Sequence, residues 1–126
     1  MPGKVVDASV VAAVAFQESN VSEAKVLLKG ADLYAPRLLA YELTSIARTK
    51  IARYPDQREN IVQLLESALA SNVRWVEVNQ ITVLYLAVSS GLSTYDASYL
   101  YVANTLGMPL VTFDKRLAAA ARMFGS

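Results

Sequence analysis

The amino-acid sequence predicts an α/β fold, a three-layer α/β/α sandwich built on a mostly parallel sheet of four or five strands. Short apolar stretches alternate with longer segments of helical period, as in parallel sheets covered by helices on both faces. The 126 residues are 54% hydrophobic, which is enough for one buried core, and no linker or repeat interrupts them. We therefore expect a single domain over residues 1–126.

The first elements are a strand and two helices. Residues 4–6 form the predicted strand, and a helix follows to about residue 17. A second helix is expected from Asn20, because Asn20 and Glu23 have the spacing of a capping box. Gly30 then ends this helix.

The next segment predicts a strand followed by a helical hairpin. Residues 33–35 form the strand, and Pro36 is expected to open a long helix as its first-turn proline. After a break at residues 54–55, Asp56 with Glu59 is expected to cap the second helix of the hairpin.

The third strand is predicted at residues 73–78. Asn79 caps the helix after it, and Gly91 ends that helix. Ser93 or Thr94 then caps a further helix.

The last predicted elements begin after Gly107, which ends the preceding helix. Residues 109–112 form the fourth strand, and a final helix covers about residues 115–123.

Composition restricts the chemistry that the chain can perform. It has no Cys and no His, so disulfides, thiolate or imidazole zinc sites and Ser-His-Asp or Cys-His catalysis are excluded. Neither a P-loop nor a Gly-x-Gly-x-x-Gly fingerprint occurs. The net charge of +1 indicates neither a polyanionic partner nor a membrane surface. A catalytic site would therefore depend on carboxylates, which favour hard cations such as Mg²⁺ or Mn²⁺.

The apolar run at residues 10–16 superficially resembles a signal peptide. Asp7 interrupts the apolar N-terminal sequence, and the apolar run that remains is too short to span a bilayer. We expect a cytoplasmic protein that does not bind a membrane.

Four acidic residues are expected at one edge of the sheet. Asp7, Asp96 and Asp114 lie at or just past predicted strand ends or in the helical turn that follows, and Glu42 lies in the helix after the second strand. Ligands of open α/β sheets bind at this carboxyl edge. Carboxylates gathered there would repel one another without a counter-ion.

Each acid also has a purely structural explanation. Asp7 and Asp114 are suited to cap helices, and Asp96 lies where a helix dipole favours negative charge. Glu42 lies beside an apolar stripe, where Arg48 or a nearby hydroxyl would serve as its partner. Position alone leaves both explanations open.

Four segments resemble the PIN-domain family and, within it, VapC-type toxins of prokaryotic toxin-antitoxin pairs. These segments are Val-Val-Asp-Ala-Ser-Val at 5–10, Glu-Leu at 42–43, Leu-Ser-Thr-Tyr-Asp-Ala-Ser-Tyr-Leu at 92–100 and Leu-Val-Thr-Phe-Asp-Lys-Arg-Leu at 110–117. The resemblance covers nearly the whole chain and is strongest in its C-terminal half. It implies a PIN-domain-like fold, in which a fifth short strand often ends the chain. Here that strand is either missing or reduced to Met123 and Phe124.

The resemblance also implies a site and a function. Asp7, Glu42, Asp96 and Asp114 would be the catalytic and metal-binding residues, and Ser9 and Thr112 the hydroxyls that support them. The protein would be an endoribonuclease that cleaves single-stranded RNA with metal-activated water, using Mg²⁺ or Mn²⁺. The implied products carry 5′-phosphate and 3′-hydroxyl ends, and a VapB-type antitoxin would block the site.

Two further expectations concern RNA and self-association. Basic residues that could bind phosphates are Arg48, Lys50, Arg53, Arg58, Lys115 and Arg116, with Tyr41, Tyr54 or Tyr95 as stacking partners. An ordinary solvated helix face is the competing explanation. Residues 83–88 are apolar around nearly the whole helix, which predicts a homodimer.

Other functions compete with the nuclease. A catalytically silent RNA- or protein-binding module need not retain all four acids, so their presence favours the enzyme. An aspartyl-phosphatase requires a second acid two residues after its nucleophile, where this chain has Ser9.

Overall fold

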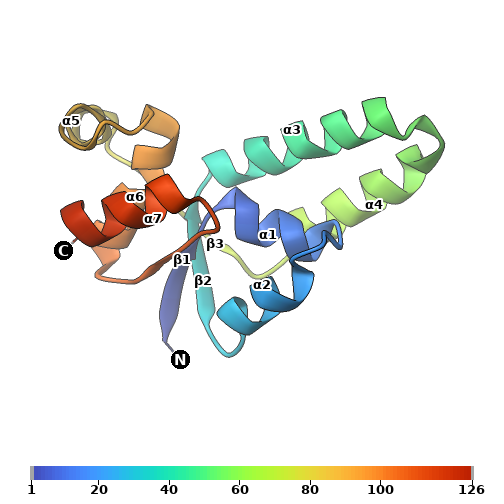
Figure 1. Ribbon diagram of the computed structural model, residues 1–126, viewed down its shortest axis with the longest axis horizontal. Helices are drawn as coiled ribbons and strands as arrows, with labels where there is room; N and C mark the ends of the chain where they lie inside the picture. Colours follow the sequence, from blue (N-terminus) through green and yellow to red (C-terminus); the bar gives the residue numbers. More distant parts are fainter. Residues whose placement is uncertain (1, 126) are drawn as a thin grey trace.

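Four parallel strands form the central sheet in the computed structural model, which describes residues 2–125 (Figure 1). Their order is β3-β2-β1-β4. The strands are β1 (Gly3–Val6), β2 (Asp32–Pro36), β3 (Arg74–Val76) and β4 (Leu110–Val111). Val5 pairs with Tyr34 on one side and with Leu110 on the other, so β1 is central. The mostly parallel sheet is confirmed, with four strands in the described part of the chain.

Helices connect and cover the strands. They are α1 (Ala8–Ala15), α2 (Val21–Leu28), α3 (Leu38–Arg53), the short 3₁₀ helix η1 (Pro55–Gln57), α4 (Arg58–Leu69), α5 (Gln80–Ser90), α6 (Thr94–Leu106) and α7 (Lys115–Phe124). The helices α1 to α4 lie on one side of the sheet and α5 to α7 on the other (Figure 1). The predicted α3–α4 hairpin is present and extends away from the sheet (Figure 1).

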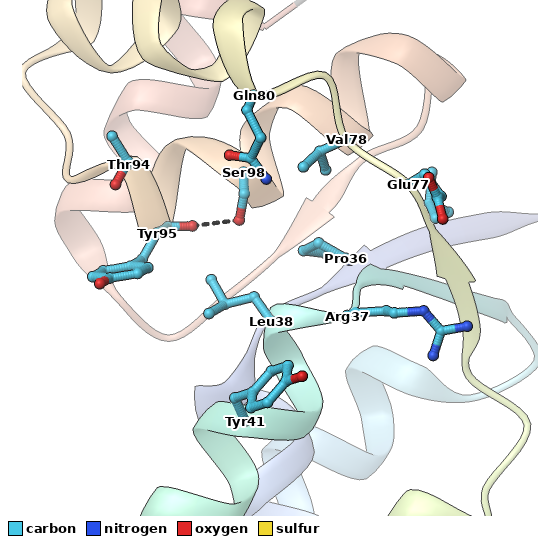
Figure 2. A pocket seen from close by; sticks show the side chains of 11 residues that line it. Pro36, Arg37, Leu38, Tyr41, Glu77, Val78, Gln80, Thr94, Tyr95 and Ser98 are labelled. Carbon is cyan, nitrogen blue, oxygen red and sulfur yellow. Dashed lines mark hydrogen bonds between the residues drawn. The ribbon is translucent and has the colours of Figure 1, made fainter.

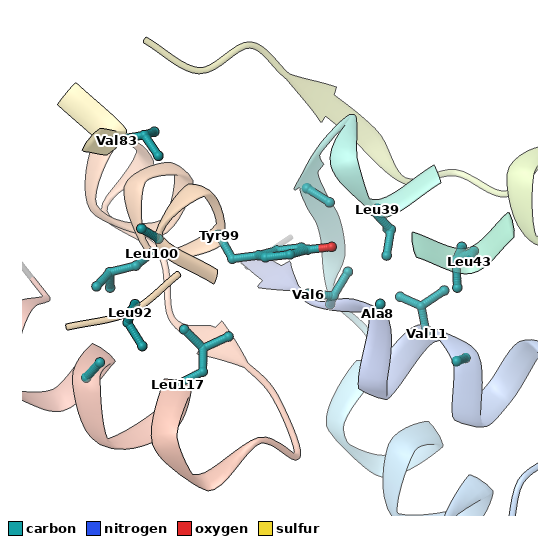
Figure 3. Packing of buried hydrophobic residues seen from close by; sticks show 14 of the residues in the cluster. Val6, Ala8, Val11, Leu39, Leu43, Val83, Leu92, Tyr99, Leu100 and Leu117 are labelled. Carbon is teal, nitrogen blue, oxygen red and sulfur yellow. The ribbon is translucent and has the colours of Figure 1, made fainter. Parts of the chain in front are cut away.

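The largest core cluster connects the sheet to both helical layers near its carboxyl edge. The ring of Tyr99 projects from α6 toward Val6 and Leu39, while Leu117 of α7 packs on the α6 side (Figure 3). All four side chains are at most 1% exposed. Burying a large apolar side chain stabilises a fold by about 1.5–3 kcal/mol, so this cluster fixes the helices that surround the carboxyl edge.

Several predicted helix ends are confirmed. Asn79 and Ser93 accept hydrogen bonds from the backbone N–H groups of Thr82 and Asp96, as capping residues do. Gly91 ends its helix with φ of 75°, a backbone conformation that only glycine adopts without strain.

Three boundary predictions were wrong. Pro36 is the last residue of β2, because it pairs with Val76 of β3, and the fixed φ of proline suits a strand end as well as a helix start. Asn20 makes no side-chain capping bond, since its ψ of 21° departs from the extended backbone of a capping residue. Asp56 lies inside η1, so Gln57 rather than Asp56 precedes α4.

Of the two alternatives for a fifth strand, a remnant at Met123 and Phe124 is excluded, because these are the last residues of α7. The strand is missing from the described part of the chain. Within residues 2–125, no helix has the length and apolar character needed to cross a membrane.

Candidate active site at the carboxyl edge of the sheet

The four predicted acids come from four different connections. Asp7 follows β1 and is the N-cap of α1, and Asp114 follows β4 and is the N-cap of α7. Asp96 lies in the first turn of α6, and Glu42 lies near the start of α3, which follows β2. The parallel sheet therefore brings all four to its carboxyl edge, although 107 positions separate Asp7 from Asp114 in the sequence.

Asp7 is the most constrained of the four. Asp7 is only 7% exposed. The Ser9 hydroxyl donates to its Oδ1 and the Thr112 hydroxyl to its Oδ2, each at 2.6 Å. Both carboxylate oxygens therefore accept a hydrogen bond from a side-chain hydroxyl, and the two donors are the residues that the resemblance named as supports; that they support a catalytic site stays a prediction.

The same two hydroxyls connect Asp7 to the segment after β4. Ser9 Oγ accepts a hydrogen bond from the backbone N–H of Phe113 at 3.0 Å. Thr112 Oγ1 accepts one from the backbone N–H of Asp114 at 2.9 Å. Asp114 Oδ1 in turn accepts from the N–H groups of Arg116 and Leu117. The position of Asp7 is thus coupled to the start of α7.

Glu42 has a partner that lies 57 positions away in sequence. The hydroxyl of Tyr99 donates to Glu42 Oε1 across the space between α6 and α3. Burial and the neighbouring carboxylate raise the pKa of Tyr99 well above its ordinary value, so the phenol keeps its proton and remains a donor. The hydroxyl alternative for Glu42 is therefore the one observed, and Arg48 is not its partner.

Asp96 lies near a cation, Arg116, that lowers its pKa. Arg116 also donates from Nη2 to the carbonyl of Gly91 at 2.7 Å. The Ser93 hydroxyl also favours the charged form of Asp96. Burial and the charges of Asp114 and Asp7 outweigh both effects.

Burial raises the pKa of three of the acids, and mutual repulsion adds to this effect for two of them. Burial is the largest cause for Asp7, Glu42 and Asp96 alike. The pKa of Glu42 is raised further by Asp96 and Asp7, and that of Asp96 by Asp114 and Asp7. The four carboxylates therefore form one electrostatically coupled group that disfavours its own full ionisation.

This group fits a hard divalent cation in its chemistry. All of its donors are oxygens, which Mg²⁺ and Mn²⁺ prefer, and a cation would relieve the repulsion that raises the pKa values. Among the residues that the structure describes, no three acids converge closely enough to form a complete ligand cluster in this conformation.

The predicted RNA-binding residues fall into two groups. Lys115 and Arg116 begin α7 directly beside Asp114. Arg48, Lys50 and Arg53 lie farther along α3, with Arg53 about 16 Å beyond Glu42 along the helix axis.

The α3 group already has intramolecular contacts. Lys50 forms an ion pair with Glu18 at 3.0 Å, and Arg53 lies over the Tyr54 ring. Of the two groups, only Lys115 and Arg116 therefore lie beside an acid of the candidate site.

Figure 2 shows the residues that line a cavity of about 400 Å³ at the carboxyl edge of the sheet. It is lined by the ends of β2 and β3 and the starts of α3, α5 and α6, and Tyr41 and Tyr95 in its lining immediately precede Glu42 and Asp96 in the sequence. Both tyrosines were predicted to contact RNA, but Arg37 and Gln80 were not. Their position just after the second and third strands was the available signal.

Comparisons with known proteins identify similar chains. The family model of the PIN domain matches residues 4–123. The chain is 31% identical over 120 residues to Ribonuclease VapC3 of Pyrobaculum aerophilum, covering 90% of this chain and 91% of that protein. A shorter match, 52% identical over 40 residues, is to Exonuclease VapC9 of the same organism and covers 32% of this chain and 30% of that one.

The fold is also similar to a solved structure. The crystal structure of PAE2754 from Pyrobaculum aerophilum superimposes with a TM-score of 0.79 at 28% sequence identity. The match covers 94% of this chain and 84% of the other.

Proposed function

Because this chain belongs to the PIN-domain family, we propose that it is a metal-dependent endoribonuclease that cleaves single-stranded RNA as the toxin of a toxin-antitoxin pair. Its similarity to a VapC ribonuclease over 90% of its length supports the nuclease activity. The observation that carries the proposal is the coupled group of four carboxylates at the carboxyl edge of the sheet, with Asp7 held by two hydroxyls.

In this proposal, Asp7 and Asp96 bind the cation directly, and Glu42 and Asp114 act through water. Mg²⁺ is the expected ion, and Mn²⁺ is the alternative. When bound, the cation activates water and offsets the negative charge of the phosphate. Asp7 is suited to direct ligation because Ser9 and Thr112 fix the orientation of its oxygens.

Tyr99 and Glu42 orient the attacking water. Tyr99 holds Glu42 in place toward the acidic group, so that its other oxygen can orient the attacking water. Attack by water on phosphorus breaks the bond to the 3′ oxygen, which leaves with a proton and gives 5′-phosphate and 3′-hydroxyl ends. This reaction requires neither a histidine nor the 2′-hydroxyl of RNA, in agreement with a chain that has no His.

RNA phosphates are proposed to bind first at Lys115 and Arg116, which lie beside the acids. Arg48, Lys50 and Arg53 would extend this surface along α3. Because Lys50 already pairs with Glu18, its contribution would be the smallest of the three.

The proposed partners are a second copy of the chain and a VapB-type antitoxin. One face of α5 supports the dimer, because its apolar residues follow helical spacing and are 48–75% exposed: Ile81, Leu84, Tyr85 and Val88. An exposed apolar face of this kind favours burial against a partner. The antitoxin would cover the carboxylates and so prevent cleavage.

Cleavage of a mixed single-stranded RNA pool tests the function. The purified protein, free of antitoxin, should cut RNA with Mg²⁺ or Mn²⁺ and stop in EDTA. Asp96→Asn keeps the side-chain shape and should abolish cutting, whereas Asp56→Asn on the exposed η1 turn should leave it unchanged. Equal cutting by Asp96→Asn would show that the site is wrong, and no cutting by the wild type would favour a silent binding module.

A further inference from the structure

The cavity beside the carboxylates has the size and surroundings of a small-ligand site. Its volume of about 400 Å³ lies within the usual range of about 300–1,000 Å³ for such sites. It opens at the carboxyl edge of a parallel sheet, where ligands of α/β folds bind. None of the four acids lines it, so it is a separate compartment next to the reacting centre.

The walls of the cavity combine aromatic and apolar surfaces. Tyr41 and Tyr95 are 75% and 64% exposed, so both rings are accessible to a ligand. Leu38, Pro36 and Val78 supply the apolar lining between them and the sheet (Figure 2). Flat aromatic ligands stack on such rings, and RNA-binding proteins hold unpaired bases in this way.

Polar groups complete the lining. The Gln80 side chain extends from the start of α5 toward the cavity (Figure 2), and its amide makes no hydrogen bond with residues 2–125. An amide offers one acceptor and two donors, which suit the edge of a base. Arg37 and Glu77 lie at the opposite side from Tyr95 in Figure 2, and neither forms an ion pair with a described residue. The positive and negative charges on this side balance each other, so the lining as a whole suits a neutral ligand such as a base.

Two residues that line the cavity are sequence neighbours of the acids. Tyr41 directly precedes Glu42 on α3, and Tyr95 directly precedes Asp96 on α6. A group held between the tyrosines is therefore next to the position where the scissile phosphate would bind. In RNA, a base and its own phosphate are separated by a single sugar, which matches two neighbouring compartments.

We propose that this cavity binds one base of the RNA, stacked on Tyr95 and recognised at its edge by Gln80, next to the phosphate that is cleaved. The inference rests on the proposed ribonuclease function and adds a determinant of where the RNA is cut. An aliphatic side chain of a protein partner is the competing occupant. It fits less well, because it would leave the Gln80 amide without a partner.

Binding of small probes tests this inference without relying on cleavage. In Mg²⁺, calorimetry would compare each common nucleoside 5′-monophosphate with ribose 5-phosphate, which lacks a base. The wild type should bind at least one of the nucleotides about 5- to 100-fold more tightly than ribose 5-phosphate. Tyr95→Ala and Gln80→Ala should remove this difference, whereas Tyr95→Phe should retain it, because stacking needs only the ring.

A matched control for Gln80→Ala lies elsewhere on the surface. Gln63→Ala, on the exposed face of α4, should leave the preference for nucleotides intact. The tested residues are exposed, and the melting temperatures of the variants would confirm that they fold.

The two proposals fail in different ways. Equal binding of nucleotides and ribose 5-phosphate by a protein that cuts RNA would overturn the base site and leave the cavity to a partner's side chain. A preference that is unchanged in Tyr95→Ala and Gln80→Ala would also overturn it. A preference lost in these variants, in a protein that cuts no RNA, would support the base site and refute the nuclease.

Discussion

Thr112 connects the buried Asp7 to the backbone of Asp114, so its hydroxyl contributes both to the position of the Asp7 carboxylate and to the stability of the fold. Thr112→Val keeps the shape and removes the hydroxyl. We expect the free energy of unfolding to fall by about 1–3 kcal/mol, because a buried carboxylate loses a donor, and RNA cleavage to fall with it. Urea denaturation and a cleavage assay would measure the two effects.

Thr44→Val is the matched control. The Thr44 hydroxyl donates to the carbonyl of Ala40 on the exposed side of α3, so its loss should change stability by less than about 0.5 kcal/mol. Equal losses in both variants would contradict the special role of Thr112.

Tyr99→Phe isolates the hydrogen bond to Glu42, because the buried ring remains in the core. The free energy of unfolding should fall by about 1–3 kcal/mol, since the half-buried carboxylate loses its donor. The kcat for RNA should fall more than the KM changes, because Glu42 is no longer oriented. Tyr101→Phe on the same helix, where no hydroxyl contact is seen within residues 2–125, should behave like the wild type in both assays.

The carboxylates also predict a pH dependence of stability. The pKa values of Asp7, Glu42 and Asp96 are raised in the folded protein, so the folded state holds protons more tightly than the unfolded chain. Their contribution to stability is therefore present below the ordinary carboxyl pKa and is lost as pH rises through the raised values. In EDTA, the melting temperature should decrease over this window.

Asp96→Asn should reduce that decrease, because it removes one titrating group and part of the repulsion on Glu42. Above the window, the variant should melt at a higher temperature than the wild type in EDTA, and added Mg²⁺ should narrow the difference. A wild-type melting temperature that falls with pH no more steeply than that of the variant would show that the acids are not coupled in solution.

Single residues show clearly what the sequence could predict. Asp7 and Asp114 were each expected to be either a cap or a ligand, and the structure shows that both are caps while lying at the same edge as the other acids. The two explanations were never exclusive. The partner of Glu42 could not be identified from local spacing, because Tyr99 approaches it only after α6 has packed against the sheet.

Helix ends give a direct comparison between two asparagines. Asn79 accepts a hydrogen bond from the N–H of Thr82 at 3.1 Å, whereas Asn20 makes no capping bond. We expect Asn79→Ala to lower the free energy of unfolding by about 0.5–2 kcal/mol and Asn20→Ala to lower it by less. Chemical denaturation would measure both, and a larger loss for Asn20→Ala would contradict the observed capping.

The same comparison explains why some element boundaries were mispredicted. A capping box depends on residue types, which the sequence shows, and on an extended backbone at the cap, which the neighbouring chain decides. At residue 20 the preceding turn fixes a different ψ. At Pro36 the pairing with β3 decided between strand and helix, and pairing between strands 40 positions apart is not visible in a local pattern.

For the whole molecule, the exposed apolar face of α5 predicts self-association. Val88→Asp should shift the protein from dimer to monomer in sedimentation, because it places a charge in the proposed interface. Val26→Asp is the control, since Val26 on α2 is 74% exposed against 75% for Val88 but lies in the opposite layer. A wild type that sediments as a monomer would refute the dimer.

The overall architecture was predictable because it follows from the order of the elements. Alternating strands and helices indicated a parallel sheet, and the carboxyl edge of such a sheet indicated where the acids would meet. The cavity was not predictable, because it is formed by the packing of three helix starts. The single domain over residues 1–126 stays a prediction.

The hydrogen bond between Asp7 and Thr112 joins residues 105 positions apart. During synthesis, Asp7 leaves the ribosome long before Thr112 and Asp114 are translated. The Oδ1 of Asp7 has its partners within the first turn of α1, but until β4 joins the edge of β1 its Oδ2 lacks the Thr112 hydroxyl, and one of the four acids is missing. A growing chain would therefore stay harmless to the messenger RNA that produces it until Asp114 has been translated and β4 has joined the sheet.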